Sequence, residues 1–96
     1  MKVRSFVHKG LKRLFLEDRT QDLPPGSADK LGKMLGFLED MDDPGELRSL
    51  SIWKAHMLTG DRKGEWSLHV TRNRRLTFRI DAVQNEICDI NLEDYH

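Results

Sequence analysis

The hydrophobic positions along this chain change their spacing near residue 45. Over residues 8–18, Leu11, Leu14 and Phe15 recur at the spacing of a helix, after a short strand candidate at residues 3–6. A second helix is predicted over residues 27–41, because its apolar residues form one stripe: Leu31, Met34, Leu35, Leu38 and Met41. Ser27 is a good N-cap for this helix, and Pro44 and Gly45 end it.

Beyond residue 45 the apolar residues alternate with polar ones, as in half-buried strands. The alternating residues are Trp66, Leu68 and Val70 in GEWSLHV, and Leu76, Phe78 and Ile80 in RRLTFRI. Residues 53–60, WKAHMLTG, and residues 86–92, EICDINL, are also predicted strands, joined to the others by hairpin-length turns. The order β-α-α-β-β-β-β predicts an α+β fold, with two helices packed on one face of a mainly antiparallel sheet.

Length and composition limit what such a fold can hold. We expect one domain over residues 1–96, and the 38% hydrophobic and 33% charged residues indicate a soluble globular protein. No apolar run approaches the roughly 20 residues of a membrane span, and the first residues lack the apolar core of a signal peptide. The cytoplasm, with no membrane contact, is therefore the expected location. The single cysteine, Cys88, supports neither a disulfide nor a zinc site and is predicted to be a small core residue.

The net charge of zero conceals four blocks of alternating sign. Residues 1–16 carry five basic residues and no acid, residues 17–53 four against nine, residues 54–80 seven against two, and residues 81–96 none against five. The two basic blocks could form one face for binding phosphate groups. They could equally be solvated faces that attract the acidic blocks.

The last strand ends in residues that could carry chemistry. Strict alternation places Cys88, Ile90 and Leu92 on one face, and continues with Asp94 and His96 at its rim. A carboxylate beside an imidazole can orient the ring and stabilise its charged form, as general acid–base catalysis requires. A solvated chain end is the simpler alternative.

Other polar residues carry weaker signals. His56 precedes the GDRKG turn, but a lone strand histidine is more often packed or exposed than catalytic, and His8 and His69 are weaker candidates still. His56, Asp94 and His96 could hold a metal, yet no local ligand spacing supports one, so no metal or other cofactor is expected. The guanidinium groups of Arg72, Arg74 and Arg75 could hold phosphate or keep an edge strand soluble, and Tyr95 could stack on a base.

Four segments follow one another in the order FVHKGLKRLF, HMLTGDRKGEWSLHV, NRRLTFRI and EDYH. In this order and at these separations they resemble the HigB-type toxins of the RelE/ParE superfamily of bacterial toxin–antitoxin systems. The resemblance implies the same β-α-α-β-β-β-β arrangement and, for typical members, a ribosome-dependent endoribonuclease that cleaves mRNA during translation. It also implies a cognate HigA-type helix-turn-helix antitoxin as partner, through which the complex binds operator DNA and represses its operon.

Matched motif by motif, the resemblance implies a catalytic set of His56, Arg75, Asp94, Tyr95 and His96. RNA can be cut without a metal when a base activates the 2′-hydroxyl, an acid protonates the leaving 5′-oxygen and a cation stabilises the phosphate. The two histidines are expected to transfer protons in an undecided order, Arg75 to bind phosphate, Asp94 to orient an imidazole and Tyr95 to position the substrate. The residues expected to bind RNA or the ribosome are Lys9, Lys12, Arg13, Arg62, Lys63, Arg72 and Arg74.

The chain departs from the family pattern in three places. Thr59 stands where a basic residue is common, Arg74 replaces a frequent aromatic, and the acidic stretch EDMDDPGE balances the usual basic charge. Ribosome binding is therefore expected to need the basic blocks 1–16 and 54–80 on one face. Two alternative functions remain: a toxin of the same fold that inhibits gyrase by binding, and a nontoxic module that binds an antitoxin.

Overall fold

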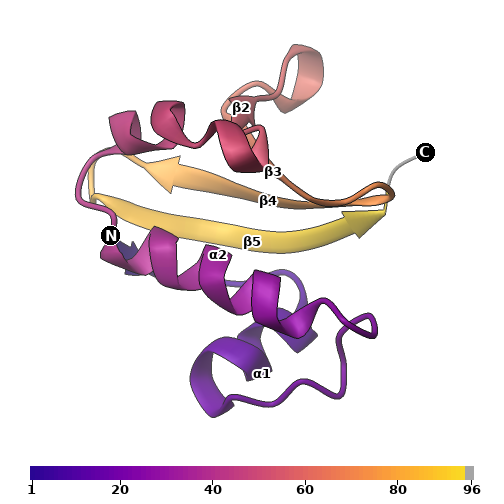
Figure 1. Ribbon diagram of the computed structural model, residues 1–96. Coiled ribbons are helices and arrows are strands. Elements are labelled where there is room, and N and C mark those ends of the chain that lie inside the picture. The colour runs from indigo at the N-terminus through magenta and orange to yellow at the C-terminus, as the bar shows by residue number, and fades with distance from the viewer. Residues whose placement is uncertain (95–96) are drawn as a thin grey trace.

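The computed structural model describes residues 1–94, which form a five-stranded sheet with two α-helices and three short 3₁₀ helices (Figure 1). The strands are β1 (Lys2–Val3), β2 (His56–Met57), β3 (Glu65–Thr71), β4 (Arg74–Asp81) and β5 (Glu86–Asp94). The helices are α1 (Lys9–Glu17), α2 (Ala28–Asp40), η1 (Pro44–Ser49), η2 (Ser51–Trp53) and η3 (Gly60–Arg62). This α+β architecture confirms the predicted fold class.

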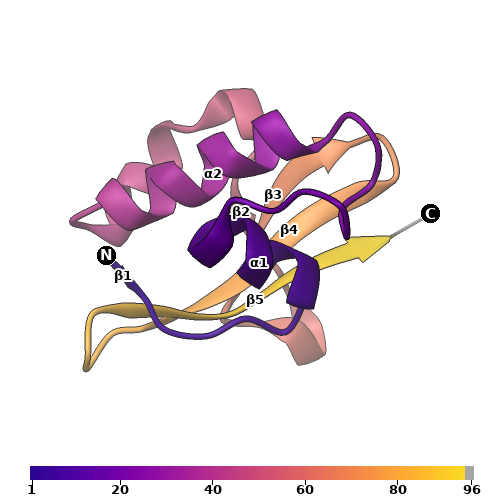
Figure 2. The same cartoon turned by 90° about the horizontal axis from the view of Figure 1, so that it is seen from below.

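The sheet has the strand order β1-β5-β4-β3-β2. Neighbouring strands are antiparallel except for β1, which runs parallel to β5. Both α-helices cover the same face of the sheet, as Figure 2 shows with α1 and α2 in front of the strands. We call the opposite face the open face.

The core lies between the helices and the sheet. Leu11 of α1 and Leu31 of α2 are completely buried there, together with Phe78 at the centre of β4. The helical stripe of α2 and the alternating positions of β3 and β4 both supply core residues, as their periodicity predicted. No helix of residues 1–94 is long and apolar enough to cross a membrane.

Two predicted strands are wrong in extent. Of residues 53–60 only His56 and Met57 pair with β3, because Trp53 belongs to η2 and its ring packs edge-on against Phe37 of α2, with centroids 5.9 Å apart. This aromatic contact draws the segment toward the helices and away from the sheet edge. Of residues 3–6 only Val3 lies in β1, and Phe6 makes one isolated bridge to Ile90.

A bulge in β5 corrects the prediction for Cys88. Thr77 pairs with Asn91 but Arg79 pairs with Cys88, so two residues of β5 lie opposite the single residue 78. The extra residue is Asp89, whose φ of 56° is in the left-handed region. The bulge reverses the alternation, so Cys88 is buried on the open face beside Arg79, outside the main core, whereas Ile90 and Leu92 face the helices.

The N-terminal cap of α2 also differs from the sequence prediction. Ser27 occupies the N-cap position of α2, but its hydroxyl donates to the carbonyl of Pro24 at 2.7 Å and caps no helical N–H. At α1 the capping residue is His8, whose Nδ1 accepts a hydrogen bond from the N–H of Leu11 at 3.2 Å. His8 is thus a structural histidine that holds the first turn of α1.

Replacing His8 with alanine is expected to destabilise the fold by about 1 kcal/mol, as for other lost N-caps, whereas asparagine restores the acceptor. Burial lowers the pKa of His8 below 6.5, although Asp22 opposes this. Because the folded state favours neutral His8, this histidine contributes stability above pH 6.5 that is lost as the pH falls through its lower folded pKa. Urea unfolding at pH 7.5 and 5.5 should show this dependence in the parent chain and a smaller one in His8→Asn, where His69, whose pKa is also lowered, still contributes.

Candidate active site

The pairing register gathers several candidate residues on the open face. His56 of β2 pairs with Ser67 of β3, and His69, two residues further along β3, pairs with Arg75 of β4. Arg75 in turn pairs with Glu93 of β5. Directly opposed side chains in a sheet lie about 5 Å apart at Cβ and diagonal ones about 7 to 8 Å, so these residues form one continuous patch.

The exposed imidazole of His56 has a defined tautomer. Its Nδ1 lies 2.8 Å from the carbonyl oxygen of Lys54. A carbonyl can only accept, so Nδ1 carries the proton and Nε2 of the neutral ring is left with a lone pair. The backbone turn that ends η2, where Lys54 has a φ of 49°, thus prepares His56 to accept a proton.

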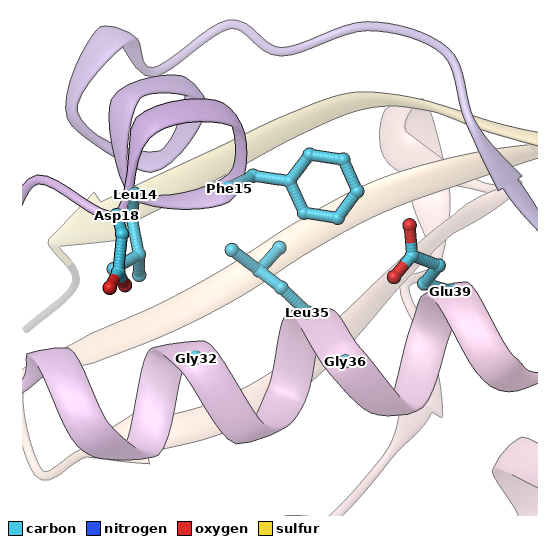
Figure 3. A pocket seen from close by; sticks show the side chains of 7 residues that line it. All are labelled: Leu14, Phe15, Asp18, Gly32, Leu35, Gly36 and Glu39. Carbon is cyan, nitrogen blue, oxygen red and sulfur yellow. The ribbon is translucent and has the colours of Figure 1, made fainter.

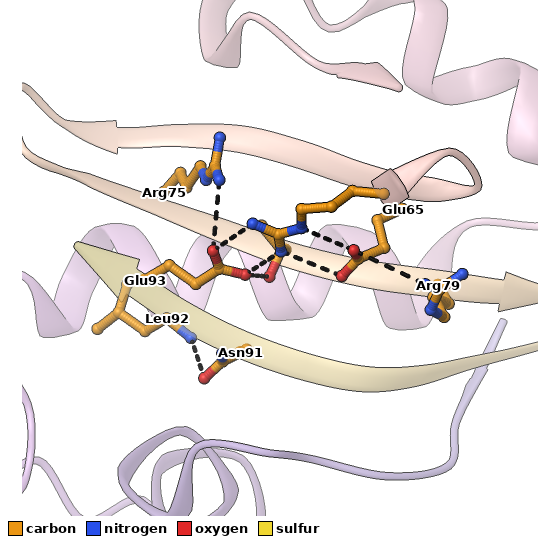
Figure 4. Close-up of polar contacts among 8 residues, drawn as sticks. Glu65, Arg75, Arg79, Asn91, Leu92 and Glu93 are labelled. Carbon is orange, nitrogen blue, oxygen red and sulfur yellow. Dashed lines mark hydrogen bonds and ion pairs between the residues drawn. The ribbon is translucent and has the colours of Figure 1, made fainter. Parts of the chain in front are cut away.

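Arg75 lies at the edge of a polar network that Figure 4 shows on the open face, with α2 behind the sheet. Its Nη2 donates to Glu93 Oε1 at 3.4 Å, and the Glu93 carboxylate also accepts from Arg62 and from Thr77. Thr77 is 1% exposed although it lies on the open face, because this network covers it. Arg75 therefore contacts this network through Glu93.

Charge pairing stabilises the ionised forms within this network. Hydrogen bonds from Arg62, then from Thr77, outweigh desolvation and lower the pKa of Glu93 to about 2. The same carboxylates raise the pKa of Arg62 above its ordinary value, Glu93 contributing more than Glu65. Near neutral pH the Arg62 guanidinium and the carboxylates of Glu65 and Glu93 are charged, so the network keeps its form throughout the physiological range.

Asp94, the last described residue, lies on the other side of the sheet plane. It pairs with Arg74 and shares the face of Leu92, as alternation predicted, and its carboxylate lies 3.0 Å from Arg74 Nε. Its side chain is 64% exposed, because β5 extends beyond the core at this point. The structure thus brings His56 and Arg75 onto one face and places Asp94 at the strand end beside Arg74. Tyr95 and His96 lie outside the described residues.

The predicted basic residues are divided by the sheet. Lys9, Lys12 and Arg13 belong to α1, and Arg13 pairs with Asp22. Arg62 and Arg75 make their contacts on the open face, whereas Lys63 and Arg72 are exposed next to η3 and in the β3–β4 turn. The basic residues of α1 therefore do not share a face with Arg62 and Arg75, because α1 packs on the helical side.

His69, which the sequence analysis treats as a weak candidate, lies next to the candidate site. It lies half-buried and opposite Arg75, and burial, followed by the charges of Lys54 and Lys30, lowers its pKa. The signal was present in the alternation of GEWSLHV, which puts His69 on the polar face of the strand. The sequence alone does not show which residue of β4 faces it.

A hollow of about 280 Å³ lies elsewhere, between α1 and α2, as Figure 3 shows. It is lined by Leu14, Phe15, Asp18, Gly32, Leu35, Gly36 and Glu39. Of the predicted catalytic residues that the structure describes, His56, Arg75 and Asp94, none lies among them. Within residues 1–94 no group of three or more His, Cys, Asp or Glu side chains is arranged to hold a metal ion.

This arrangement of strands and helices is the fold of the RelE/ParE-type toxins. The chain is similar to a YoeB/ParE toxin from Agrobacterium tumefaciens, with a TM-score of 0.61 and 15% identity over all of both chains. It is also similar to a chain of the YoeB–YefM complex from Staphylococcus aureus, with a TM-score of 0.56 and 16% identity over 100% of this chain and 99% of that one.

Sequence comparison narrows the class to one family. The model of the RelE-like toxin HigB of type II toxin–antitoxin systems matches residues 4–96. The chain is 38% identical to Endoribonuclease HigB of Proteus vulgaris over 94 aligned residues. The alignment covers 98% of this chain and 99% of that protein. The chain therefore belongs to the HigB-like toxin family, as its sequence motifs predicted.

Proposed function

We propose that this protein is a ribosome-dependent endoribonuclease that inhibits translation by cleaving mRNA without a metal ion. The family match and the nearly full-length relative support an endoribonuclease toxin of a type II system. The observation that carries the proposal is the patch on the open face, where His56 presents a proton-accepting Nε2 on the same face as the guanidinium of Arg75.

These two groups suit the first step of RNA cleavage by in-line transfer. His56 Nε2 takes the proton of a 2′-hydroxyl, and the oxygen attacks the adjacent phosphorus. Negative charge then builds on the phosphate oxygens, to which Arg75 can donate from a fixed position. The P–O5′ bond breaks, leaving a 2′,3′-cyclic phosphate and a 5′-hydroxyl whose proton comes from an acid.

We assign the remaining roles to the end of the chain. His96 supplies the proton to the leaving oxygen, Asp94 orients that imidazole and Tyr95 positions a base. The ion pair between Arg74 and Asp94 is largely exposed and costs little to open, since such pairs contribute only about 0 to 1 kcal/mol. The phosphates of mRNA and ribosomal RNA are bound by the exposed cations among Lys9, Lys12, Arg13, Lys63, Arg72 and Arg74.

In the cell the toxin acts in the cytoplasm, where its substrate is translated. Its partner is a HigA-type helix-turn-helix antitoxin, through which the complex reaches operator DNA. Membership in a type II toxin–antitoxin family supports this pairing.

Induction of the protein without its antitoxin tests the proposal. Growth should stop, and primer extension on cellular mRNA should show discrete new 5′ ends within open reading frames under translation. DNA damage without new ends would favour gyrase inhibition instead. A tight complex with the antitoxin but unimpaired growth would favour a nontoxic binding module.

A further inference from the structure

Almost all N–H donors of the Arg62 guanidinium form hydrogen bonds with other side chains of the protein. Its Nε and Nη2 donate to Glu65 at 2.8 and 3.1 Å, and its Nη1 donates to Glu93 at 2.7 Å. Nη2 also donates to the second oxygen of Glu93, so four of the five N–H donors are used. Glu65 belongs to β3 and Glu93 to β5, and Figure 4 labels both carboxylates. Arg62 of η3 therefore bridges the two strands across β4.

Glu93 connects this bridge to the catalytic arginine. One oxygen accepts from Arg62 at 2.7 Å and from Arg75 at 3.4 Å, and the other accepts from Arg62 and from Thr77 at 2.6 Å. The side chains of Glu93 and Arg75 are only 19% and 21% exposed. The contact with Arg75 is the longest of these hydrogen bonds, and so it is the one that a ligand can replace most easily.

We propose that Glu93 is a positioning residue for Arg75, clamped by Arg62 and Thr77, and that its carboxylate holds the Arg75 guanidinium ready for an RNA phosphate. This inference rests on the proposed function, because it assumes that Arg75 binds phosphate. It also gives Arg62 a role inside the protein, in place of the RNA contact expected from the sequence.

The clamp explains how an arginine near the start of β4 can be preorganised. Arginine has many rotamers, and fixing them before the reaction lowers the cost of aligning the guanidinium with the transition state. Among the described side chains of this cluster, three guanidinium groups face two carboxylates, so the cluster is cationic overall. An incoming phosphate can therefore take over donors of Arg75 while Arg62 keeps Glu93 in place.

If Glu93 positions Arg75, its substitution should move KM and kcat in a way that a purely structural role does not predict. In Glu93→Gln the competing negative charge is gone, so RNA in the ground state should bind about threefold more tightly. The guanidinium also loses its charged partner Glu93 and is aligned less firmly, so kcat should fall by about tenfold. Cleavage of mRNA on programmed ribosomes, measured over a range of complex concentrations, should show this opposite movement of KM and kcat.

Two matched variants serve as controls. Glu65→Gln removes the other carboxylate of the same guanidinium but leaves the contact between Glu93 and Arg75. Asp81→Asn removes an open-face carboxylate that also bonds an arginine, Arg4, at 2.7 Å. We expect Glu65→Gln to change kcat by less than threefold and Asp81→Asn to leave it unchanged. Equal losses in Glu93→Gln and Glu65→Gln would overturn the positioning role, because they would show that only anchoring of η3 matters.

A double-mutant cycle and a binding assay complete the test. In an Arg75→Lys background, Glu93→Gln should lower kcat no further, whereas additive effects would overturn the proposal. Anisotropy of a short fluorescent single-stranded RNA, titrated over a range of salt, needs no cleavage. Glu93→Gln should steepen the salt slope by about 0.7, the value for one more neutralised phosphate. If the parent protein cleaves nothing, the proposed function fails, and an unchanged slope in this assay separately overturns the clamp.

Discussion

Replacing Arg75 with alanine is expected to lower kcat for mRNA cleavage by about 100- to 1000-fold, the usual effect of removing one preorganised donor to a developing charge. KM should rise much less, because most RNA affinity comes from phosphate contacts spread over the surface. Single-turnover cleavage on programmed ribosomes separates the two quantities. Arrest of growth on induction should disappear in parallel.

The matched control is Arg79→Ala, four residues along the same strand. Arg79 is also an arginine of the open face, and its guanidinium lies 3.7 Å from Glu65. The substitution Arg79→Ala removes the same charge from the same surface, so the kcat of this variant should stay within about threefold of the parent value. Similar losses in both variants would mean that general positive charge, and not a group at the reacting phosphate, is what Arg75 provides.

The second large effect is expected at the last three residues. A chain ending at Glu93 should lose growth arrest and at least 1000-fold in cleavage rate, since it removes the proposed acid together with the residues that position it. The fold should survive, because the buried residues of β5, Ile87, Cys88 and Ile90, precede the cut. Thermal unfolding and binding of the antitoxin would verify this in the same preparations.

Truncation also places a new terminal carboxylate beside Arg75, which could inhibit the protein by itself. The full-length variant Asp94→Asn, Tyr95→Phe, His96→Gln avoids that charge and should be equally inactive. His96→Gln alone should account for about 100-fold of the loss. A truncated chain with undiminished toxicity would remove these residues from the mechanism and leave His56 and Arg75 as the whole site.

The helical stripe of α2 and the alternation in β3 and β4 were predictable because each depends on spacing along a continuous segment. The fold class followed from their order. The extent of β2 and the face of Cys88 were not predictable, because each is set by a contact with distant residues. Trp53 packs against Phe37. At the Asp89 bulge, β5 forms hydrogen bonds with residues 5–8, among them one from the N–H of Asp89 to Ser5 Oγ.

The same division holds for the site. His56 and Arg75 were predicted from motifs, since their residue types and neighbours are local features. Their place on one face with His69 depends on strand register, which sequence alone does not provide.

By itself, then, the sequence determined the order of helices and strands, the family, and the residue types that the proposed chemistry needs. Only the tertiary structure decided how the arginines are used. Arg62, Arg74 and Arg75 look alike in the sequence, but one bridges two carboxylates, one pairs with Asp94 and one lies beside Glu93. Charge acts over a few ångströms in space, so the role of each guanidinium follows from the carboxylate that folding brings to it.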